Sequence, residues 1–331
     1  MTPFSTPDRH AALATLERLT RGDDTAVAPD ARAEASAPFG RLDGSGLVDL
    51  FAQLRRALPD LERRDDIFLA GANHEDDRWA EPRPDRLVAC CGSYVGTFRE
   101  PFAGIPPTGG VVSLNYGEAH AIEDGRVRAS WLVWDIAQLM MQAGVWPMSP
   151  PLGAPFHWPA PRGGDGVRLA PSEETGSLDR VLDMHAGLNA FRGGDITSIP
   201  MHHWHPDFMY WAGGGIGACR GVAGFRAHHQ IPYRRAFPQA QGAGHFIRLS
   251  DGPFAVTGGD VEVVHTGAEY MGIAPTGRTL RFRVMDFYRF DADNLIAENW
   301  LPNDTIGLMA QMGVDVMARM AHRTGAPRTT L

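Results

Sequence analysis

The chain has 331 residues and a formal net charge of −8, and all 31 of its basic residues are arginine, because the sequence contains no lysine. A net negative charge argues against a nucleic-acid partner, because binding to phosphate backbones relies on a basic surface. The absence of lysine excludes Schiff-base chemistry, pyridoxal phosphate attachment and the lysine of a P-loop.

Cysteine content and the N-terminus bear on the compartment. Three cysteines, Cys90, Cys91 and Cys219, are too few for a disulfide framework, which favours a reducing environment. The first ten residues lack the basic and apolar segments of a signal peptide, and no apolar run approaches the roughly 20 residues of a membrane-spanning helix. We therefore expect a cytoplasmic protein without a membrane partner.

The first half of the sequence predicts helices followed by strands. A helix begins at Thr6-Pro7 and ends near Gly22, and a second, with apolar residues at helical spacing, ends at Pro59. The pattern then predicts strands and a last short helix, over Ile67–Ala72, Leu87–Thr97, Val111–Ile122, Val127–Asp135 and Ile136–Ala143. Helices that precede an antiparallel meander indicate an α+β class, with the helices on one face of a curved sheet.

The second half repeats the first. The loop sequence GIPPTG at 104–109 returns as GIAPTG at 272–277. The same landmarks follow each loop in the same order, Trp131, Asp135, Gln142 and Gly144 in one copy and Trp300, Asp304, Gln311 and Gly313 in the other. Upstream of this loop, the first copy carries about ten more residues than the second. These matches predict a tandem duplication.

A segment rich in proline and glycine, Pro147–Pro171, separates the two copies, and neither a helix nor a central strand would tolerate it. We therefore predict a first domain over residues 1–150, a linker over 151–174 and a second domain over 175–331. In the second copy, helices are expected from Ser177, from Val222 and over Thr305–Met312.

Ionisable residues fall on apolar strand faces. The period of two places Glu118 and His120 on one face of the strand 111–122, and Asp286 and Tyr288 on the matching face of the second copy. In each copy we expect the next strand of the hairpin to place a tryptophan and an aspartate on the face that borders the cavity, Trp131 and Asp135 in the first copy and Trp300 and Asp304 in the second. A carboxyl group in an apolar cavity has a raised pKa that suits acid–base catalysis. A paired, purely structural carboxylate is the alternative for each acid.

These motifs resemble the SnoaL-like polyketide cyclase family, within the superfamily of cone-shaped α+β barrels typified by nuclear transport factor 2. The resemblance rests on the Pro-Thr-Gly loop, on the sequences at 116–120, 123–126 and 131–135, and on their counterparts around 283–288 and 298–304. It implies two tandem cones, each with an apolar cavity, and acid–base chemistry that needs no cofactor. In cyclases of this kind an aspartate acts with a histidine in an aldol condensation. Asp135 and Asp304 match the aspartate, and His120 matches the histidine, which Tyr288 replaces in the second copy.

The second cone has the richer set of candidates. The residues that we expect to take part in catalysis are Asp304, Asp286, His265, Tyr288, Asp135, His120 and Glu118. The residues that we expect to contact a substrate are His205, Asp207, Trp211, Trp300, Tyr116 and Trp131. Acid–base work is assigned to Asp304 or Asp286, with His265 and Tyr288 as hydrogen-bond donors to a developing enolate oxygen.

Two further motifs bear on metal and cofactor binding. Seven of the 13 histidines lie between His202 and His265, but the spacing fits no established metal motif, so we expect no bound metal. The glycines at 213–217 resemble a dinucleotide fingerprint but lack the acidic residue about 20 positions on, so we expect a loop and no cofactor.

The sequence favours a cofactor-independent cyclase, isomerase or hydrolase that acts on a small hydrophobic carbonyl compound. A protein that binds such a compound without turnover is the main alternative, and a structural role for the paired cones is the third. We expect the sheets of the two cones to pack together as an internal pseudo-dimer, to which a homo-oligomer could be added.

Overall fold

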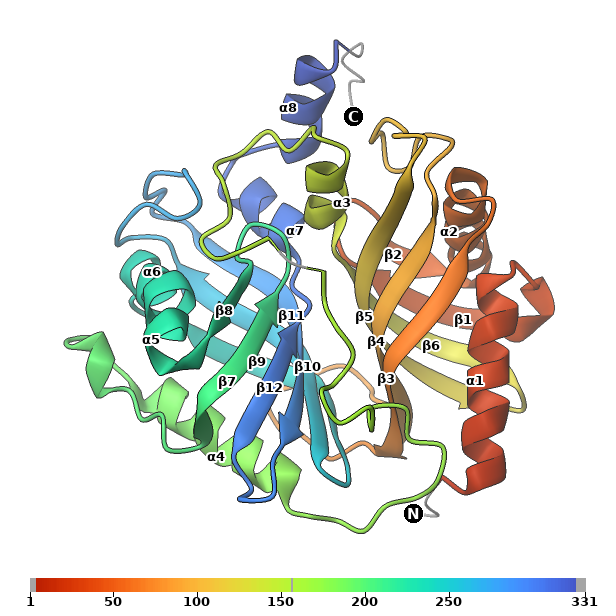
Figure 1. The fold of residues 1–331 in the computed structure, drawn as a ribbon, viewed down its shortest axis with the longest axis horizontal. Helices are drawn as coiled ribbons and strands as arrows, with labels where there is room; N and C mark the ends of the chain where they lie inside the picture. The colour runs from red at the N-terminus through yellow and green to blue at the C-terminus, as the bar shows by residue number, and fades with distance from the viewer. Residues whose placement is uncertain (1–3, 156, 326–331) are drawn as a thin grey trace.

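Two six-stranded sheets of the same design form the protein (Figure 1). The computed structural model describes residues 4–155 and 157–325. The first half comprises α1 (Thr6–Thr20), η1 (Asp24–Ala26), β1 (Val27–Ala35), β2 (Gly40–Asp43), α2 (Gly44–Ala57), β3 (Glu62–Ala72), β4 (Arg86–Thr97), β5 (Val111–Glu123), β6 (Arg126–Trp134) and α3 (Ile136–Gln142).

The second half repeats this order with extra short helices. It comprises α4 (Ser177–Ala190), η2 (Ile196–Ser198), β7 (Trp204–Ala212), β8 (Ala218–Arg220), α5 (Gly221–Phe225), the π-helix η3 (Arg226–Gln230), α6 (Ile231–Ala236), β9 (Gln241–Asp251), β10 (Phe254–Val264), β11 (Thr279–Phe290), β12 (Ile296–Leu301), α7 (Thr305–Gln311) and α8 (Val316–Arg323).

The sheets have matching topologies. The strand orders are β2-β1-β6-β5-β4-β3 and β8-β7-β12-β11-β10-β9, and the parallel pairs β1 with β6 and β7 with β12 interrupt otherwise antiparallel sheets. Helices α1 and α2 cover the outer face of one sheet, α4 to α6 cover the outer face of the other, and the uncovered faces meet in the centre (Figure 1). The predicted tandem α+β cones are confirmed, although β1 was not anticipated from the sequence.

Equivalent residues make equivalent contacts in the two halves. The backbone N–H of Asp135 donates to the carbonyl oxygen of Asn115 at 2.9 Å, and that of Asp304 donates to the carbonyl of Arg283 at 3.0 Å. The amide of Gln142 bonds the backbone of Ser113, and Gln311 bonds that of Arg281 in the same two-bond arrangement. The duplication therefore extends from the sequence to individual hydrogen bonds.

The central interface consists of one face of each sheet. Trp131 stacks on Phe246 of the other half, with ring centroids 4.9 Å apart. Gly117 lies so close to Pro302 that a Cβ atom would come within 2.4 Å of the proline ring. Because β4 has this interface on one side and the cone interior on the other, it is buried along almost its whole length.

Trp131 and Trp300 were expected to face the cone interior, and this expectation was wrong. Residues directly opposite in an antiparallel pair share a face, and Trp300 lies opposite Phe287, whereas Asn299 lies opposite Tyr288. A register shift between Arg289 and Phe290 separates the hairpin turn from the rest of this pair, and an extra residue at such a bulge reverses the alternation of faces. The tryptophans therefore face the central interface, and Asn299 faces the cone interior.

The segment between the halves packs against both of them. Among the described residues from 143 to 176, none belongs to a helix or a named strand. Trp158 is buried in the interface and donates from its indole to the carbonyl oxygen of Ala212, and Val167 forms a bridge with Phe68 of β3. The segment passes in front of the two sheets on its way from α3 to α4 (Figure 1).

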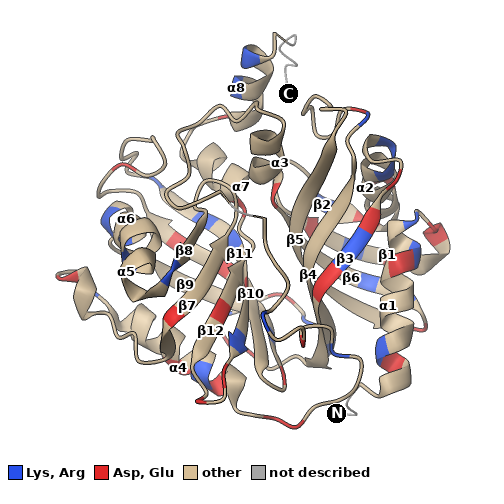
Figure 2. Ribbon diagram, viewed as in Figure 1, with Lys and Arg blue, Asp and Glu red and all other residues tan. Residues whose placement is uncertain are grey.

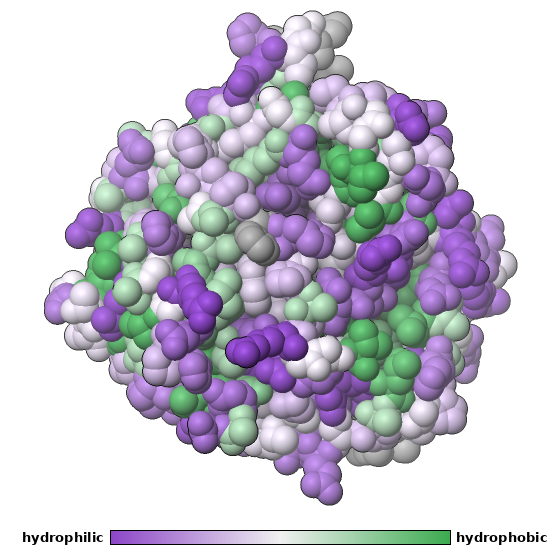
Figure 3. Space-filling model, viewed as in Figure 1, coloured by the Kyte–Doolittle hydropathy of each residue, from purple (hydrophilic) through white to green (hydrophobic). Residues whose placement is uncertain are grey.

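Acidic and basic residues neighbour one another on the first part of β3, from Glu62 to Asp65 (Figure 2). The face in view is largely hydrophilic, with separate small hydrophobic areas (Figure 3). None of the helices within the described ranges is both long and apolar enough to cross a membrane.

Candidate functional site

The interior of the first cone is filled by a buried polar network around Glu118. Its carboxylate accepts hydrogen bonds from the Arg63 guanidinium at 2.8 Å, from the Tyr94 hydroxyl at 2.7 Å and from the Trp134 indole at 2.7 Å. The Nε2 atom of His120 lies 3.1 Å from the same carboxylate. Although burial acts in the opposite direction, Arg63 and these hydrogen bonds lower the pKa of Glu118 to about 2, so Glu118 is an ionised structural group.

A second carboxylate completes this network. Asp65 binds Arg63 through both of its oxygens and also accepts from the Tyr116 hydroxyl at 2.7 Å. Tyr94 and Tyr116 are fully buried, with ring centroids 4.5 Å apart. Every polar group at the centre of the first cone therefore has a partner, and large side chains fill the space.

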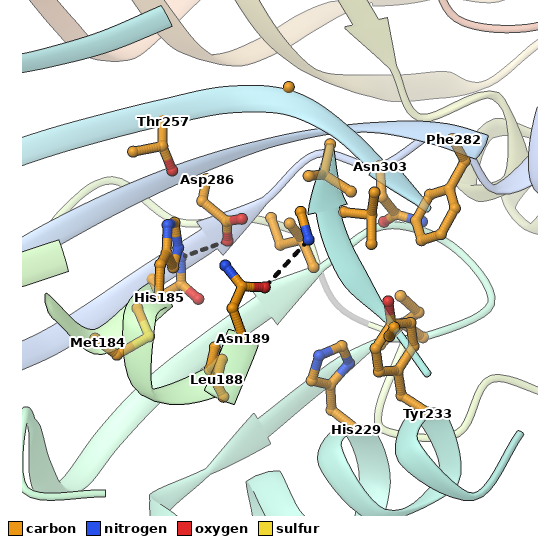
Figure 4. A pocket seen from close by; sticks show the side chains of 18 of the residues that line it. Met184, His185, Leu188, Asn189, His229, Tyr233, Thr257, Phe282, Asp286 and Asn303 are labelled. Carbon is orange, nitrogen blue, oxygen red and sulfur yellow. Dashed lines mark hydrogen bonds between the residues drawn. The ribbon is translucent and has the colours of Figure 1, made fainter. Parts of the chain in front are cut away.

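The second cone is hollow. A cavity of about 190 Å³ lies between its sheet and the helices that cover it (Figure 4). Its polar lining includes His185, Asn189, Tyr210, His229, Tyr233, His245, Thr257, Asp286, Tyr288, Asn299 and Asn303. Its apolar lining includes Met184, Leu188, Trp204, Ile216, Phe225, Val261, Phe282, Val284, Leu301 and Leu308. A mainly apolar cavity with a few converging polar groups is typical of a small-molecule site.

Four exchanges of a large residue for a small one explain why only one of the two equivalent interiors holds this cavity. The strand registers place Gly242 where the first half has Arg63, Val261 where it has Tyr94, Val284 where it has Tyr116, and Asn303 where it has Trp134. All four replacements line the cavity. The space that aromatic rings and a guanidinium fill in one half is therefore available to a ligand in the other.

Asp286 occupies the position of Glu118 but has few partners. Its carboxylate accepts one hydrogen bond, at 3.2 Å, from the Asn299 amide, and it points toward the cavity (Figure 4). Burial raises the pKa of Asp286 to about 7, and the polar side chains of Asn299 and Tyr288 beside it offset only part of that effect. Near neutral pH this carboxyl group can therefore accept or release a proton.

Tyr288 and His185 form the neighbouring polar pair. The Tyr288 hydroxyl lies 3.1 Å from Nε2 of His185, which projects from α4. Burial, together with the positive charges of Arg248 and Arg78 nearby, lowers the pKa of His185 to about 3, so its imidazole is neutral at physiological pH. Burial raises the pKa of Tyr288 well above its usual value, so its hydroxyl keeps its hydrogen.

A π-helical turn places another histidine in the cavity wall. The wide turn of η3 carries His229, whose ring lies 4.9 Å from that of Tyr210. Among the described residues, neither Nδ1 of His229 nor the hydroxyl of Tyr210 has a hydrogen-bond partner. Isolated π-helical turns occur frequently at functional sites, and these two polar groups are available to a ligand.

The two aspartates at the hairpin ends lie outside the cavity lining. Asp135 and Asp304 begin α3 and α7 as N-caps, accepting from the backbone N–H of Gln138 at 3.0 Å and of Gly307 at 2.8 Å. Each also accepts a backbone bond from the opposite half, Asp135 from Gly214 at 2.9 Å and Asp304 from Ala37 at 3.2 Å. These reciprocal contacts tie the halves together.

The remaining predicted residues are dispersed. His265 is buried beside the Pro-Thr-Gly loop, with Nε2 3.2 Å from the carbonyl oxygen of Ala268. His205 accepts from the backbone of the exposed Asp207 at 3.1 Å. Trp211 stacks on Trp300, with centroids 4.9 Å apart, in the central interface. With Trp131 in that interface and His120, Tyr116 and Glu118 in the filled cone, only Asp286 and Tyr288 of the predicted residues line the cavity.

Several residues that line the cavity were not identified from the sequence, His185, Asn299 and His245 among them. His185 lies on the apolar face of α4, four positions after Val181, and this spacing was a usable signal. Asn299 was hidden by the error of one residue in the face of β12. His245, on β9, had no distinguishing pattern.

One group of residues has the spacing of metal ligands. Asp183, His202 and His203 bring one possible ligand atom each within 4.8 Å of one another. The two histidines lie in a turn, so their rings are 4.0 Å apart and do not point to opposite sides as an extended chain would require. Asp183 and His202 are exposed.

Comparison with known proteins identifies the family. The family model of the SnoaL-like polyketide cyclases matches residues 11–143 and 185–312. The chain belongs to this family. The two matched regions coincide with the two cones, so the protein is a tandem SnoaL-like protein.

Solved structures resemble single halves of this SnoaL-like chain. AclR from Streptomyces galilaeus is 21% identical, covers 43% of this chain and 83% of its own, and has a TM-score of 0.36. IdmH from Streptomyces antibioticus is 22% identical, with 42% and 98% covered and a TM-score of 0.30. TerC, crystallised with polyporic acid, is 18% identical, with 42% and 100% covered and a TM-score of 0.33. No curated protein matched the chain.

Proposed function

We propose that the second cone is the catalytic site of a cofactor-independent acid–base enzyme, a cyclase or isomerase, that acts on a small hydrophobic carbonyl compound. The observation that carries this proposal is the cavity in which Asp286, Tyr288 and His185 converge among apolar side chains. Membership of the SnoaL-like polyketide cyclase family supports the same reaction class.

In the proposed first step, the ionised Asp286 carboxylate removes a proton from the carbon next to the substrate carbonyl. The electron pair of the broken C–H bond forms the carbon–carbon double bond of an enolate, and the carbonyl π pair moves to the oxygen. His185, in the tautomer that donates from Nε2, bonds the Tyr288 oxygen, so that the Tyr288 hydroxyl donates to the enolate oxygen. A hydrogen bond of this kind in a dry site contributes several kcal/mol to transition-state stabilisation.

The second step differs between a cyclase and an isomerase. In a cyclase, the enolate carbon attacks another carbonyl of the same molecule, and the protonated Asp286 returns its proton to the new alkoxide. In an isomerase, Asp286 returns the proton to a different carbon. The pKa of Asp286 near 7 suits both of its roles, because the group must be ionised for the first step and protonated for the second.

Hydrogen–deuterium exchange tests the shared first step without knowledge of the natural substrate. An aryl methyl ketone such as 2-acetylnaphthalene is incubated with the protein in D2O, and the loss of the methyl proton signal is followed by NMR. We expect faster exchange than in buffer and a decrease of about 100-fold or more in Asp286→Asn, because a positioned base contributes roughly 10² to 10⁴ in rate.

Asp293→Asn is the matched control, because Asp293 is an exposed acid in the turn that follows the same strand. Saturable binding of the ketone without exchange would contradict the proposed enzymatic function. It would favour a non-catalytic binding protein of the same fold. Exchange that persists in Asp286→Asn would show that another group is the base.

A further inference from the structure

The connection between β3 and β4 breaks the symmetry of the duplication. It spans residues 73–85 in the first half, whereas the equivalent connection between β9 and β10 consists of Gly252 and Pro253 alone. The extra residues that the sequence comparison detected in the first copy therefore lie here. We name residues 73–85 the long loop.

The long loop is fastened to the second half. Asn73 donates to the carbonyl oxygen of Phe246 at 2.9 Å and accepts from the backbone N–H of Arg248 at the same distance. The backbone N–H of His74 donates to the Arg248 carbonyl oxygen at 2.8 Å. Trp79 packs edge-on against Phe246, with centroids 5.8 Å apart. These contacts hold the loop against β9, the strand that carries His245.

Asp76 is the buried acid of the long loop. Its carboxylate lies 2.9 Å from Nδ1 of His245 and accepts from the backbone N–H of the same residue at 3.0 Å. The side chains of Arg78 and Arg248 bind the same carboxylate, at 2.8 Å and 2.6 Å, and keep it ionised. Arg78 and Arg248 nitrogens, which can only donate, lie 3.3 Å from the same Nδ1 atom. The Asp76 carboxylate can only accept and is the closer partner, so it favours the tautomer of His245 that carries the hydrogen on Nδ1.

His245 in turn supports the catalytic pair. Its ring stacks on that of His185, with centroids 5.4 Å apart and planes inclined by 14°. His185 lies 3.1 Å from the Tyr288 hydroxyl, and both line the cavity. A chain of contacts therefore runs from a carboxylate of the first half to the proposed oxyanion donor of the second.

We propose that Asp76 is a positioning residue for the site in the second cone, so that the first half, whose own cone is filled, completes the catalytic site of its neighbour. Asp76 fixes the His245 ring, this ring fixes the plane of His185, and His185 orients the Tyr288 hydroxyl. The proposal rests on the proposed function for its catalytic consequence, whereas the ring geometry is independent of any reaction.

Two measurements on the full chain test the proposal. In protein labelled with 15N-histidine, we expect Asp76→Asn to change the tautomer of His245 and the titration of His185, because a neutral amide can either donate to Nδ1 or accept from it. The groups facing these two rings are Asp76, Arg78, Arg248 and the Tyr288 hydroxyl. Asp77→Asn, an exposed neighbour in the same loop, is the matched control and should leave both signals unchanged.

The ketone exchange assay gives the second readout. Asp76→Asn should lower the exchange rate at saturating 2-acetylnaphthalene by about 10-fold and change its KM by less than about 2-fold, because misplaced groups affect the reaction more than apolar binding. His245→Asn, whose amide can still donate to Asp76, should give the same loss in a folded protein even if Asp76→Asn fails to fold.

The two readouts separate the possible failures. An unchanged His245 tautomer and an unchanged exchange rate in Asp76→Asn would overturn the positioning role. Absence of exchange in the wild-type protein, with the histidine signals altered in Asp76→Asn, would instead contradict the proposed function and leave the positioning of His185 supported.

Discussion

Glu118 and Asp286 occupy the same position in the two copies of the sheet but have opposite surroundings. Arg63, Tyr94 and Trp134 all bond the Glu118 carboxylate, whereas Asp286 accepts one bond from Asn299 and borders a cavity. Their pKa values accordingly move apart, to about 2 for Glu118 and to about 7 for Asp286. The same sheet position therefore carries a paired, ionised carboxylate in the first half and the proposed acid–base group in the second.

Asp286→Asn should stabilise the protein above neutral pH. Because the folded-state pKa of Asp286 is raised to about 7, the ionised form is disfavoured in the folded protein, and stability is lost as pH rises from about 4 to 7. The variant removes this loss, so its free energy of unfolding should match that of the wild type near pH 4 and exceed it by about 1–3 kcal/mol at pH 8. Urea unfolding at both pH values measures the difference, and a variant less stable at pH 8 would contradict the burial argument.

Glu118→Gln should destabilise the protein without affecting the second cone. The substitution removes one of the two carboxylates that bind the buried Arg63, and breaking a buried ion pair of this kind costs up to about 3–5 kcal/mol. In the wild type, the lowered pKa means that the stabilisation is present above pH 4.5 and is lost as pH falls toward 2. Urea unfolding should show the loss at pH 7, with Glu123→Gln on the exposed end of β5 as control. If Glu118→Gln lowered the ketone exchange rate as much as Asp286→Asn does, catalysis would instead lie in the first cone.

The sequence predicted the duplication, the α+β class and the strand that carries Asp286, because repeated motifs and strict alternation survive in one dimension. It could not predict that Asp304 faces the opposite half, because a single bulge reverses the faces of a hairpin. Nor could it show which cone is hollow, since that depends on side chains from four strands, such as Val261 and Val284, meeting in space. The contribution of Asp76 depends on a contact between the halves that no local pattern encodes.

Val284→Tyr should close the cavity. Tyr116 is the equivalent residue of the filled first cone, so a tyrosine ring at this position should project into the space that a ligand would occupy. We expect binding of 2-acetylnaphthalene, followed by fluorescence, to weaken by at least about 10-fold, because the ring would occupy part of the cavity of about 190 Å³ in which the ketone would lie. Val111→Tyr, at an exposed position of β5, is the control. Unchanged binding by Val284→Tyr would place the ligand elsewhere.

Asp304→Ala and Asp135→Ala should behave alike, as structural substitutions. Each removes an N-cap and a bond to a backbone N–H of the other half, Ala37 for Asp304 and Gly214 for Asp135. Loss of such a cap costs about 0.5–2 kcal/mol, so both variants should unfold at lower urea concentration while ketone exchange changes by less than about 2-fold. Both measurements are made at pH 7.5. Burial raises the pKa of Asp135 only to about 6, so that group is ionised at this pH.

A loss of exchange in Asp304→Ala alone, at unchanged stability, would assign the base to Asp304 and contradict the assignment to Asp286. A loss in both variants that follows their stability would show only that the two halves must remain docked, which Asp76→Asn tests separately through the His245 tautomer.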